Sequence, residues 1–443
     1  MAGSEPTAAY VQHGRVLRSV LEDLTECGPP ILPSRLDAVL GAQSAEALRE
    51  LVHLDYRRKV GAFFTTGQLR DRITEVVANL PGRTIVDPTC GAGDLLIAAA
   101  DRLPVLSSLA DTLAIWETQL FGLDLHSEFV EAARIRLTLK AVQCIQQAGL
   151  EVSFDLPDNY VPFAESITKA DFRMQLQGSR ASDIVVLNPP YTRMRAPADC
   201  SWAGGGTSTA AVFFLEALDL LSSGGHIVAI LPDSLRSGSL FAKWRARVEA
   251  QTDVLLVQRL GIFDQYADID VFLLVARVGK SIESVGPAAW WDFGSLVPSG
   301  SATLGELFEV RVGAVVDNRD PIEGEEYPFL VARDLPSGGT MNTPNRRRKF
   351  LGRVFTPPFV VLRRTSRPSP PGIARANGVI VTGRQQVAVD NHLLVASPHS
   401  GGMEQCRSLL KVLADPRISL VLDERISCRH LTVGAVKELP WLV

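Results

Sequence analysis

Short apolar runs and amphipathic segments alternate between residue 84 and about residue 280, and this alternation constrains the fold of the 443-residue chain most strongly. The apolar or β-branched runs are Thr84–Val86, Leu120–Leu123, Asp183–Leu187, His226–Leu231, Val254–Leu260 and Val271–Ala276. Most of the segments between them space their apolar residues as a helix does, for example Phe129–Ala141 and Ala210–Leu221. Strands that alternate with helices favour a parallel sheet wrapped by helices. We therefore expect an α/β domain in this region.

The pattern differs on both sides of this region. Residues 1–60 show helical spacing between polar breaks. After about residue 285, glycine, proline, serine and arginine become more frequent, and short strand-like runs such as Phe359–Arg363 replace the alternation. We predict three parts: a helical N-terminal segment over residues 1–60, an α/β domain over residues 61–285, and an α+β domain over residues 286–443.

Composition narrows the class of protein. The hydrophobic fraction is 46% and the charged fraction 21%, which allows a core of ordinary size for a globular protein. Six cysteines occur without a Cys-x-x-Cys pair, which argues against a zinc cluster or a disulfide framework and fits a reducing cytosol. No apolar run reaches the roughly 18 residues of a membrane span, and Met1–Pro6 lacks the basic start of a signal peptide. We expect a cytoplasmic protein without a metal site.

The charge is unevenly distributed along the chain. The formal net charge is −4, yet residues 341–384 contain ten basic residues and no acidic one. The ten are Arg346, Arg347, Arg348, Lys349, Arg353, Arg363, Arg364, Arg367, Arg375 and Arg384. Local positive charge governs phosphate binding, because each neutralised phosphate releases counterions. The stretch predicts contact with nucleic acid, with a solvated basic surface as the alternative.

A glycine-rich turn follows the first predicted strand. Asp87-Pro88-Thr89-Cys90-Gly91-Ala92-Gly93-Asp94 leads into an apolar helical segment. Glycines let the backbone approach a ligand closely, and a helix N-terminus offers unpaired N–H groups. The turn lacks the lysine of a phosphate-binding loop, and Asp87 favours a cationic ligand over a pyrophosphate. A tight turn without a ligand remains the alternative.

Two further acids lie where the next strands end. Asp124 closes the second predicted strand, a position that suits two ribose hydroxyls; an ordinary helix cap is the alternative. Asp171 stands beside Phe172, so this pair could accept from an adenine amino group and pack on its ring, with an ordinary structural role as the alternative.

The most specific motif is Asn188-Pro189-Pro190-Tyr191, directly after the run Asp183–Leu187. Two successive prolines fix φ and remove two backbone donors, so the backbone presents carbonyl acceptors rigidly. The side-chain oxygen of Asn188 and the carbonyl oxygen of Pro189 can hold both N–H groups of a planar amine and draw its nitrogen toward a pyramidal, reactive geometry. Tyr191 adds an aromatic face. The tetrapeptide predicts methyl transfer to an amino group.

These motifs resemble those of the class I S-adenosylmethionine-dependent amino-methyltransferases. The upstream sequence Gly61-Ala62-Phe63-Phe64-Thr65-Thr66 resembles the Gly-x-Phe/Tyr-x-Thr-Pro motif of gamma-class N6-adenine DNA methyltransferases, with Thr66 in place of the usual proline. The resemblance covers residues 61–280. It implies a Rossmann-like mixed sheet of about seven strands with helices on both faces, and a C-terminal α+β target-recognition domain over residues 286–443.

The resemblance also implies roles for single residues. The cofactor would be held by Phe63 and Thr65 at its methionine carboxylate, by Asp87, Pro88, Gly91 and Gly93 at the methionine end, by Asp124 at the ribose, and by Asp171 and Phe172 at the adenine. The catalytic set would be Asn188, Pro189, Pro190 and Tyr191, with Phe263 facing Tyr191 across an adenine flipped out of duplex DNA. A cognate restriction endonuclease or another defence-system subunit is the implied partner besides double-stranded DNA.

Other functions share part of this pattern. Asn-Pro-Pro-Tyr also occurs in enzymes that methylate a protein glutamine and in some RNA guanine methyltransferases. The Gly61–Thr66 motif and the basic stretch favour DNA. A cytosine-ring methyltransferase would need a cysteine nucleophile after a proline in the fourth-strand motif, and none is present there. A scaffold that binds DNA without chemistry would have to treat the tetrapeptide as coincidence.

Overall fold

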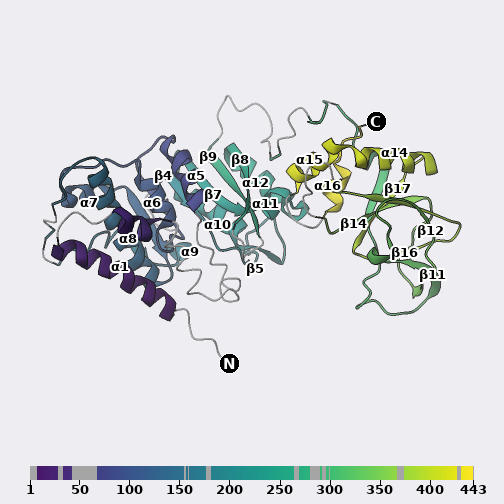
Figure 1. Cartoon of the computed structure of the whole chain (residues 1–443), viewed down its shortest axis with the longest axis horizontal. Helices are drawn as coiled ribbons and strands as arrows, with labels where there is room; N and C mark the ends of the chain where they lie inside the picture. The colour runs from purple at the N-terminus through teal and green to yellow at the C-terminus, as the bar shows by residue number, and fades with distance from the viewer. Residues whose placement is uncertain are drawn as a thin grey trace. The chain divides into compact units, whose positions relative to one another are not determined.

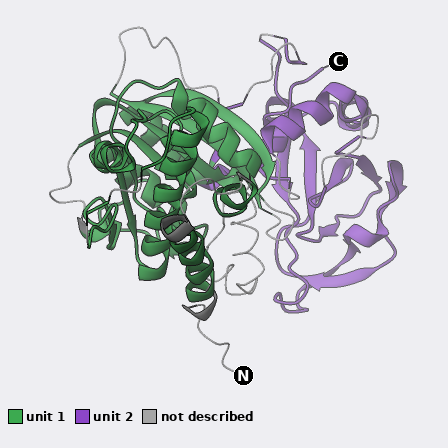
Figure 2. Cartoon of the chain, turned by 60° about the vertical axis from the view of Figure 1, so that its left-hand side comes forward, with its two compact units in different colours: residues 1–235, 241–288 green, residues 236–240, 289–443 purple. Residues whose placement is uncertain are grey.

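The computed structural model describes residues 7–27, 33–41, 67–153, 156–157, 159–175, 181–263, 269–279, 290–291, 296–298, 300–366, 374–426 and 431–442. The chain divides into two compact units (Figure 2). Unit 1 comprises residues 1–235 and 241–288, and unit 2 comprises residues 236–240 and 289–443. Within the described residues, no helix is both long and apolar enough to cross a bilayer.

Unit 1 is built on a seven-stranded sheet in the order β3-β2-β1-β4-β7-β9-β8. Its strands are β1 (Ile85–Asp87), β2 (Leu120–Asp124), β3 (Ile167–Lys169), β4 (Ser182–Leu187), β7 (Leu221–Pro232), β8 (Thr252–Ile262) and β9 (Asp270–Val278). The five strands from β3 to β7 are parallel, and β9 runs antiparallel to both β7 and β8. The predicted α/β fold with a mixed sheet of about seven strands is confirmed.

Helices precede the first of these strands and follow most of them along the chain. They are α1 (Thr7–Cys27), α2 (Pro33–Leu40), α5 (Gly67–Ala78), α6 (Asp94–Ala100), α7 (Leu109–Glu117), α8 (Ser127–Gln147), α9 (Phe172–Gln175), α10 (Thr209–Ala217), α11 (Asp233–Ser237) and α12 (Ala242–Gln251). In β4 the successive residues Ile184 to Leu187 are all fully buried. Because neighbouring strand residues point to opposite faces, both faces of the sheet are covered at its centre.

The N-terminal helices belong to the core of unit 1. Figure 1 shows α1 lying along α8, and α2 also packs on α8. Leu17 of α1 and Leu36 of α2 are buried in the same apolar cluster as β1 and α6. The helical periodicity of residues 7–27 and 33–40 is thus explained by burial against the α/β domain.

Unit 2 combines a five-stranded sheet, β10-β17-β14-β15-β12, with a three-stranded sheet, β13-β11-β16. The strands are β10 (Phe308–Val312), β11 (Glu325–Leu330), β12 (Gly339–Asn342), β13 (Arg347–Phe350), β14 (Phe359–Arg363), β15 (Gly378–Thr382), β16 (Ala388–Val389) and β17 (Leu393–Pro398). The helices are α13 (Leu304–Leu307), α14 (Gly402–Ala414), α15 (Pro416–Arg425) and α16 (Val433–Lys437).

The larger sheet of unit 2 separates two apolar layers. On one face, Val360 and Leu362 of β14 pack with the helices α14, α15 and α16. On the other face, Phe359 and Val361 pack with residues of the smaller sheet, such as Val389. This alternation along β14 is the two-residue period of a strand that is buried on both sides.

A short hairpin follows the tetrapeptide in unit 1. Its strands are β5 (Arg193–Arg195) and β6 (Gly206–Ser208), which pair antiparallel. Arg193 and Arg195 are exposed and, two residues apart, lie on the same side of β5. These strands were not predicted, because neither contains an apolar run.

Candidate active site

The glycine-rich turn between β1 and α6 is closed by backbone hydrogen bonds. The N–H of Cys90 donates to the carbonyl oxygen of Leu123 at 2.9 Å, and the N–H of Gly93 donates to that of Cys90 at 2.8 Å. Gly93 has a φ of +86°, and a Cβ there would lie 3.2 Å from the Cβ of Ala133. A Cβ on Gly91 would meet nothing within 4 Å, so this side of the turn is open.

Asp124 joins the turn to the end of β2. Its Oδ2 accepts from the N–H of Gly91 at 3.0 Å, and its Oδ1 accepts from the N–H of His126 at 2.8 Å. The structure therefore brings Gly91 and Asp124 together, as the predicted cofactor site requires. Burial raises the pKa of Asp124, and the hydrogen bonds from His126 and Gly91 act in the opposite direction.

Asp87 at the end of β1 is a buried carboxyl group, 2% exposed. Burial, together with the nearby carboxylates of Asp124 and Asp94, raises its pKa to about 8, against the N–H of Thr89 that donates to it. A positively charged group beside Asp87 would favour its ionised form. The site thus suits a cationic ligand.

The acid and the aromatic residue after β3 lie near the end of β2, because the N–H of Ala170 donates to the carbonyl oxygen of Asp124 at 2.9 Å. Asp171 is exposed, and its Oδ1 accepts from the N–H of Arg173 at 3.0 Å, as a helix cap does. Phe172 is 3% exposed and its ring packs edge-on against Phe213, with 5.5 Å between ring centroids.

The tetrapeptide lies at the same edge of the sheet, because β4 is the parallel neighbour of β1. The hydroxyl of Tyr191 donates to Oδ1 of Asn188 at 2.9 Å and lies 3.1 Å from the carbonyl oxygen of Ile230 on β7. Burial raises the pKa of Tyr191 well above its usual value, so the phenol is neutral and remains a donor. The proposed amino-group acceptor of Asn188 is thus in use by Tyr191 in this conformation.

The rings of Tyr191 and Phe263, predicted to face each other across a flipped adenine, are in direct edge-on contact. Their ring centroids are 5.9 Å apart and the ring planes are at 86°, so one ring presents its edge to the other. Phe263 is 2% exposed. A base between two parallel rings would need them about 7 Å apart, two van der Waals contacts of about 3.5 Å each. The two rings therefore have to separate before a base can stack between them.

Phe63 and Thr65, with the rest of the Gly61–Thr66 motif, lie outside the described residues, and their predicted contact with the methionine carboxylate stays a prediction. Pro88 is buried within the turn, Pro189 is buried after β4, and Pro190 is partly exposed. The cofactor and catalytic roles of all the predicted site residues likewise stay predictions.

Part of the basic stretch of unit 2 is folded against acidic residues. Residues 347–350 form strand β13, which pairs with the acidic start of β11, Glu325 and Glu326. Arg348 is 7% exposed and forms an ion pair with Asp317. Acidic residues from before residue 341 thus neutralise part of the charge that the sequence concentrates at 346–349.

Other arginines of this stretch also have internal partners. Arg375 is 4% exposed and pairs with Asp423 at 2.6 Å. Arg363 donates to the carbonyl oxygens of Ala332 and Leu335, and Arg364 donates to that of Asn391. Arg384 is exposed in the loop between β15 and β16.

Arg384 belongs to a surface that the sequence did not predict and that we call the polar edge: residues 342–347, 383–386 and Thr356. The segments are linked by hydrogen bonds, since Arg347 Nη1 donates to Gln385 Oε1 at 3.0 Å and Gln386 Nε2 donates to Thr356 Oγ1 at 3.2 Å. Four amide and three guanidinium side chains lie on it: Asn342, Asn345, Gln385, Gln386, Arg346, Arg347 and Arg384. These residues include no acid. Of these seven residues, only the three arginines were identified from the sequence.

Comparison with known proteins supports the predicted relationship. Residues 51–251 match the model of the N-6 DNA Methylase family. A curated relative, the type II methyltransferase M.VspI of Vibrio sp. strain 343, is 22% identical over 220 residues, which are 48% of this chain and 47% of that protein. The chain thus spans about half the length of the curated relative that it matches.

One solved structure supports the fold, and a second shows a weaker similarity. The type IIL restriction-modification enzyme MmeI, solved in complex with DNA, aligns with a TM-score of 0.55 and 12% identity over 92% of this chain and 71% of that chain. The modification subunit of a putative type I restriction enzyme from Vibrio vulnificus aligns with a TM-score of 0.36 and 18% identity over 54% of this chain and 50% of that chain. The family match over residues 51–251 and the curated relative, rather than these structures, bear out the resemblance to N6-adenine DNA methyltransferases.

Proposed function

We propose that this chain, which carries an N-6 DNA methylase domain, is a site-specific DNA methyltransferase that transfers a methyl group from S-adenosylmethionine to the N6 amino group of adenine in duplex DNA. One observation carries the proposal. The parallel strands β1 and β4 bring a turn suited to a cationic ligand and the Asn188–Tyr191 acceptor motif to the same edge of one sheet.

The residues at this edge fit S-adenosylmethionine. The buried Asp87 would face its positively charged end, and the open side of Gly91 leaves space for it. The two carboxylate oxygens of Asp124 offer about four acceptor positions, so they can accept ribose hydroxyls beside the backbone N–H groups of Gly91 and His126. Asp171 and Phe172 would meet the adenine. When bound, the cofactor supplies an electrophilic methyl group.

The chain's own contribution to the reaction is to position the target nitrogen. Oδ1 of Asn188 and the carbonyl oxygen of Pro189 would accept the two N–H groups of the adenine. This directs the nitrogen lone pair out of the ring plane and toward the methyl group. Asn188 and Pro189 would hold the nitrogen in line with the methyl group that a bound cofactor would supply, and the proton that the nitrogen gives up would pass to solvent.

Base flipping would coincide with a change at Tyr191. In the described conformation its hydroxyl holds Oδ1 of Asn188 and its ring contacts Phe263. An incoming adenine would take over the Asn188 oxygen and separate the rings, and stacking would offset part of the cost of extruding the base. Tyr191 and Phe263 would then enclose the base.

DNA recognition is assigned to unit 2, and within it to the polar edge. Arginine reads guanine, and asparagine and glutamine read adenine, through paired hydrogen bonds in the major groove. The polar edge offers all of these side-chain types, although Arg346 and Arg347 also form ion pairs with the neighbouring Asp334 and Glu326. A cognate restriction endonuclease or another defence-system subunit would be a further partner.

The proposal is tested by offering tritiated S-adenosylmethionine to the purified chain with duplex DNA, total RNA and a protein extract. We expect label in DNA, released as N6-methyladenine on hydrolysis. Label only in protein would favour transfer to a glutamine, and label only in RNA would favour an RNA base. Binding of DNA without cofactor binding would favour the scaffold function.

A further inference from the structure

We infer that the N-terminal helices α1 and α2 are part of the cofactor site and fix the geometry of its two turns, with Tyr10 and Arg136 as positioning residues. The two turns are the glycine-rich turn over residues 91–94 and the turn between β2 and α8 over residues 124–126. The nature of the cofactor rests on the proposed function; the support of the two turns does not.

Arg136 on α8 links α2 to the glycine-rich turn. Its side chain is fully buried, and its Nε donates to the carbonyl oxygen of Val39 in α2 at 2.9 Å. Its Nη1 donates to the carbonyl oxygen of Ala92 at 2.6 Å and lies 2.9 Å from Oδ1 of Asp94. One guanidinium thus holds both Ala92 and Asp94 to the last turn of α2.

The burial of the charged Arg136 side chain is energetically unfavourable by itself. A buried guanidinium loses its hydration, and the loss is recovered only through good hydrogen bonds. Nη2 of Arg136 is buried without a hydrogen-bond partner among the described residues. A fold that needed only packing here could use an apolar side chain instead. The three contacts toward α2 and the turn are what the arginine adds.

Tyr10 on α1 supports the second turn. Its side chain is 3% exposed, and its ring centroid lies 4.1 Å from that of Phe129 and 5.8 Å from that of His126. The N–H of His126 donates to Oδ1 of Asp124, the predicted ribose ligand. A change in the packing of Tyr10 would therefore shift the backbone that orients Asp124.

His13 lies one helical turn after Tyr10 and is 5% exposed. Burial and the positive charge of Arg136 lower its pKa to about 4, against the opposite effect of Asp94. His13 is therefore neutral near pH 7, and the pairing of Arg136 with Asp94 is undisturbed by a second positive charge. The buried side of α1 thus lies next to both turns. Tyr10 packs at the turn over residues 124–126, and His13 lies beside the Arg136–Asp94 pair of the glycine-rich turn.

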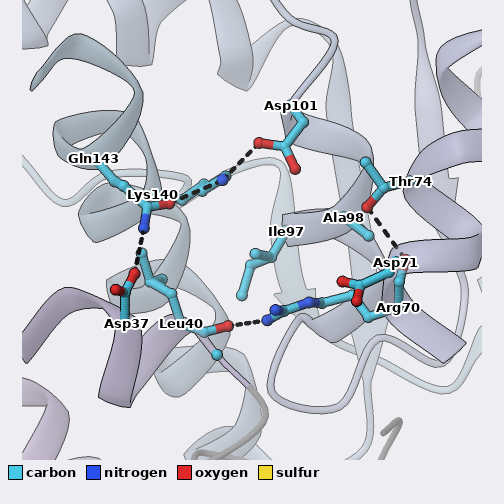
Figure 3. A pocket seen from close by; sticks show the side chains of 11 residues that line it. Asp37, Leu40, Arg70, Asp71, Thr74, Ile97, Ala98, Asp101, Lys140 and Gln143 are labelled. Atoms are coloured by element: carbon cyan, nitrogen blue, oxygen red, sulfur yellow. Dashed lines mark hydrogen bonds and ion pairs between the residues drawn. The ribbon is translucent and has the colours of Figure 1, made fainter. Parts of the chain in front are cut away.

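Further contacts hold α2 in place, as Figure 3 shows around a polar cavity between α2, α5, α6 and α8. Asp37 Oδ1 accepts from Gln143 Nε2 at 3.1 Å, and the carbonyl oxygen of Leu40 accepts from Arg70. Helix α2 is therefore anchored to α5 and α8 as well as to the turn. Its position is transmitted to Ala92 and Asp94 through Arg136.

The test compares Tyr10→Leu and Arg136→Met with a matched control, Arg18→Ala. Arg18 and Glu131 form an exposed ion pair between the same two helices, α1 and α8, but contact neither turn. Calorimetry with S-adenosylmethionine should show at least tenfold weaker binding for Tyr10→Leu and Arg136→Met, and a change below twofold for Arg18→Ala. The KM for the cofactor should rise while kcat at saturating cofactor is retained.

A second readout does not depend on the cofactor. Compared with Arg18→Ala, hydrogen exchange of the ligand-free protein should be faster over residues 124–126 in Tyr10→Leu and over residues 91–94 in Arg136→Met. If Arg136→Met does not fold, Tyr10→Leu still decides. Wild-type affinity and exchange in a folded Tyr10→Leu variant would overturn the inference. If the wild-type chain fails to bind the cofactor, the proposed function is contradicted instead. The hydrogen-exchange data would still test whether α1 and α2 support the two turns.

Discussion

At the scale of single residues, the carboxyl group of Asp87 is the most informative. Its pKa in the folded protein, about 8, lies above the value of about 3.8 expected in the unfolded chain. The folded state therefore binds more protons, so this group stabilises the fold at low pH and loses that contribution as the pH rises from about 4 to about 8. A cation bound beside Asp87 would reverse the preference.

Binding of a cationic cofactor should therefore release a proton from Asp87 near pH 7. Calorimetry at pH 7 in two buffers of different ionisation enthalpy would measure the number of protons released. We expect the release of close to one proton for the wild-type chain and almost none for Asp87→Asn. At pH 8 without ligand, Asp87→Asn should also melt at a higher temperature than the wild type. Equal proton release by both would remove Asp87 from the site.

Asn188 gives the second prediction at this scale. Asn188→Ala should lower the turnover by about 10²–10³, the scale for removal of one preorganised hydrogen-bond partner. Cofactor affinity should change little, because Asn188 follows β4 and is not part of the turn that holds Asp87 and Gly91. Methyl-transfer assays and calorimetry separate the two quantities. Normal turnover in the alanine variant would show that the tetrapeptide is not the catalytic acceptor.

At the scale of structural elements, the polar edge yields a prediction about sequence preference. Replacing Arg384, Gln385 or Gln386 by alanine should reduce the preference for the target duplex over other duplexes. The expected loss is about 1–3 kcal/mol for each bidentate hydrogen bond to a base that the variant can no longer form. Arg353 is a control, because it is 51% exposed and lies 3.8 Å from Glu309, outside the polar edge. Binding titrations on target and scrambled duplexes would measure the preference. A larger decrease for Arg353→Ala than for Arg384→Ala would contradict the assignment.

The sequence predicted the strands that carry a long apolar run. β4 and β7 were visible because strands buried on both faces need continuous apolar residues. β3 was missed because just one of its three residues, Ile167–Lys169, is buried, whereas all three residues of β1 are. β13 was missed for another reason: its arginines are neutralised by acids distant in the sequence, and a local count of charge cannot register such pairing.

The candidate site was predictable to the same extent. Asp87, Gly91 and Asp124 were identified from their positions at strand ends, and the structure brings them together at one edge. The hydrogen bond from Tyr191 to Asn188 and the edge-on contact with Phe263 were not predictable, because side-chain rotation leaves no trace in a motif. The role of Arg136 could not be predicted either, because its contacts join residues that are far apart in the chain.

At the scale of the whole molecule, the two units are interleaved along the chain, since residues 236–240 belong to unit 2. Arg236 is fully buried and donates to the carbonyl oxygen of Glu424 at 2.8 Å, and Arg425 donates to that of Ser237 at 2.8 Å. A chain cut after residue 288 would leave this segment without its partners. We expect residues 1–288 alone to melt at a lower temperature than the full chain; an unchanged unfolding temperature would contradict this.

Adenine methylation in DNA is tested most directly by base-resolved sequencing of modified bases in DNA from cells that express the chain. We expect N6-methyladenine at one short sequence motif in cells with the wild-type chain, and its absence or strong reduction with Asn188→Ala expressed to the same level. Unmodified adenines with a well-expressed wild-type chain, or equal modification by Asn188→Ala, would contradict adenine methylation by this chain through Asn188.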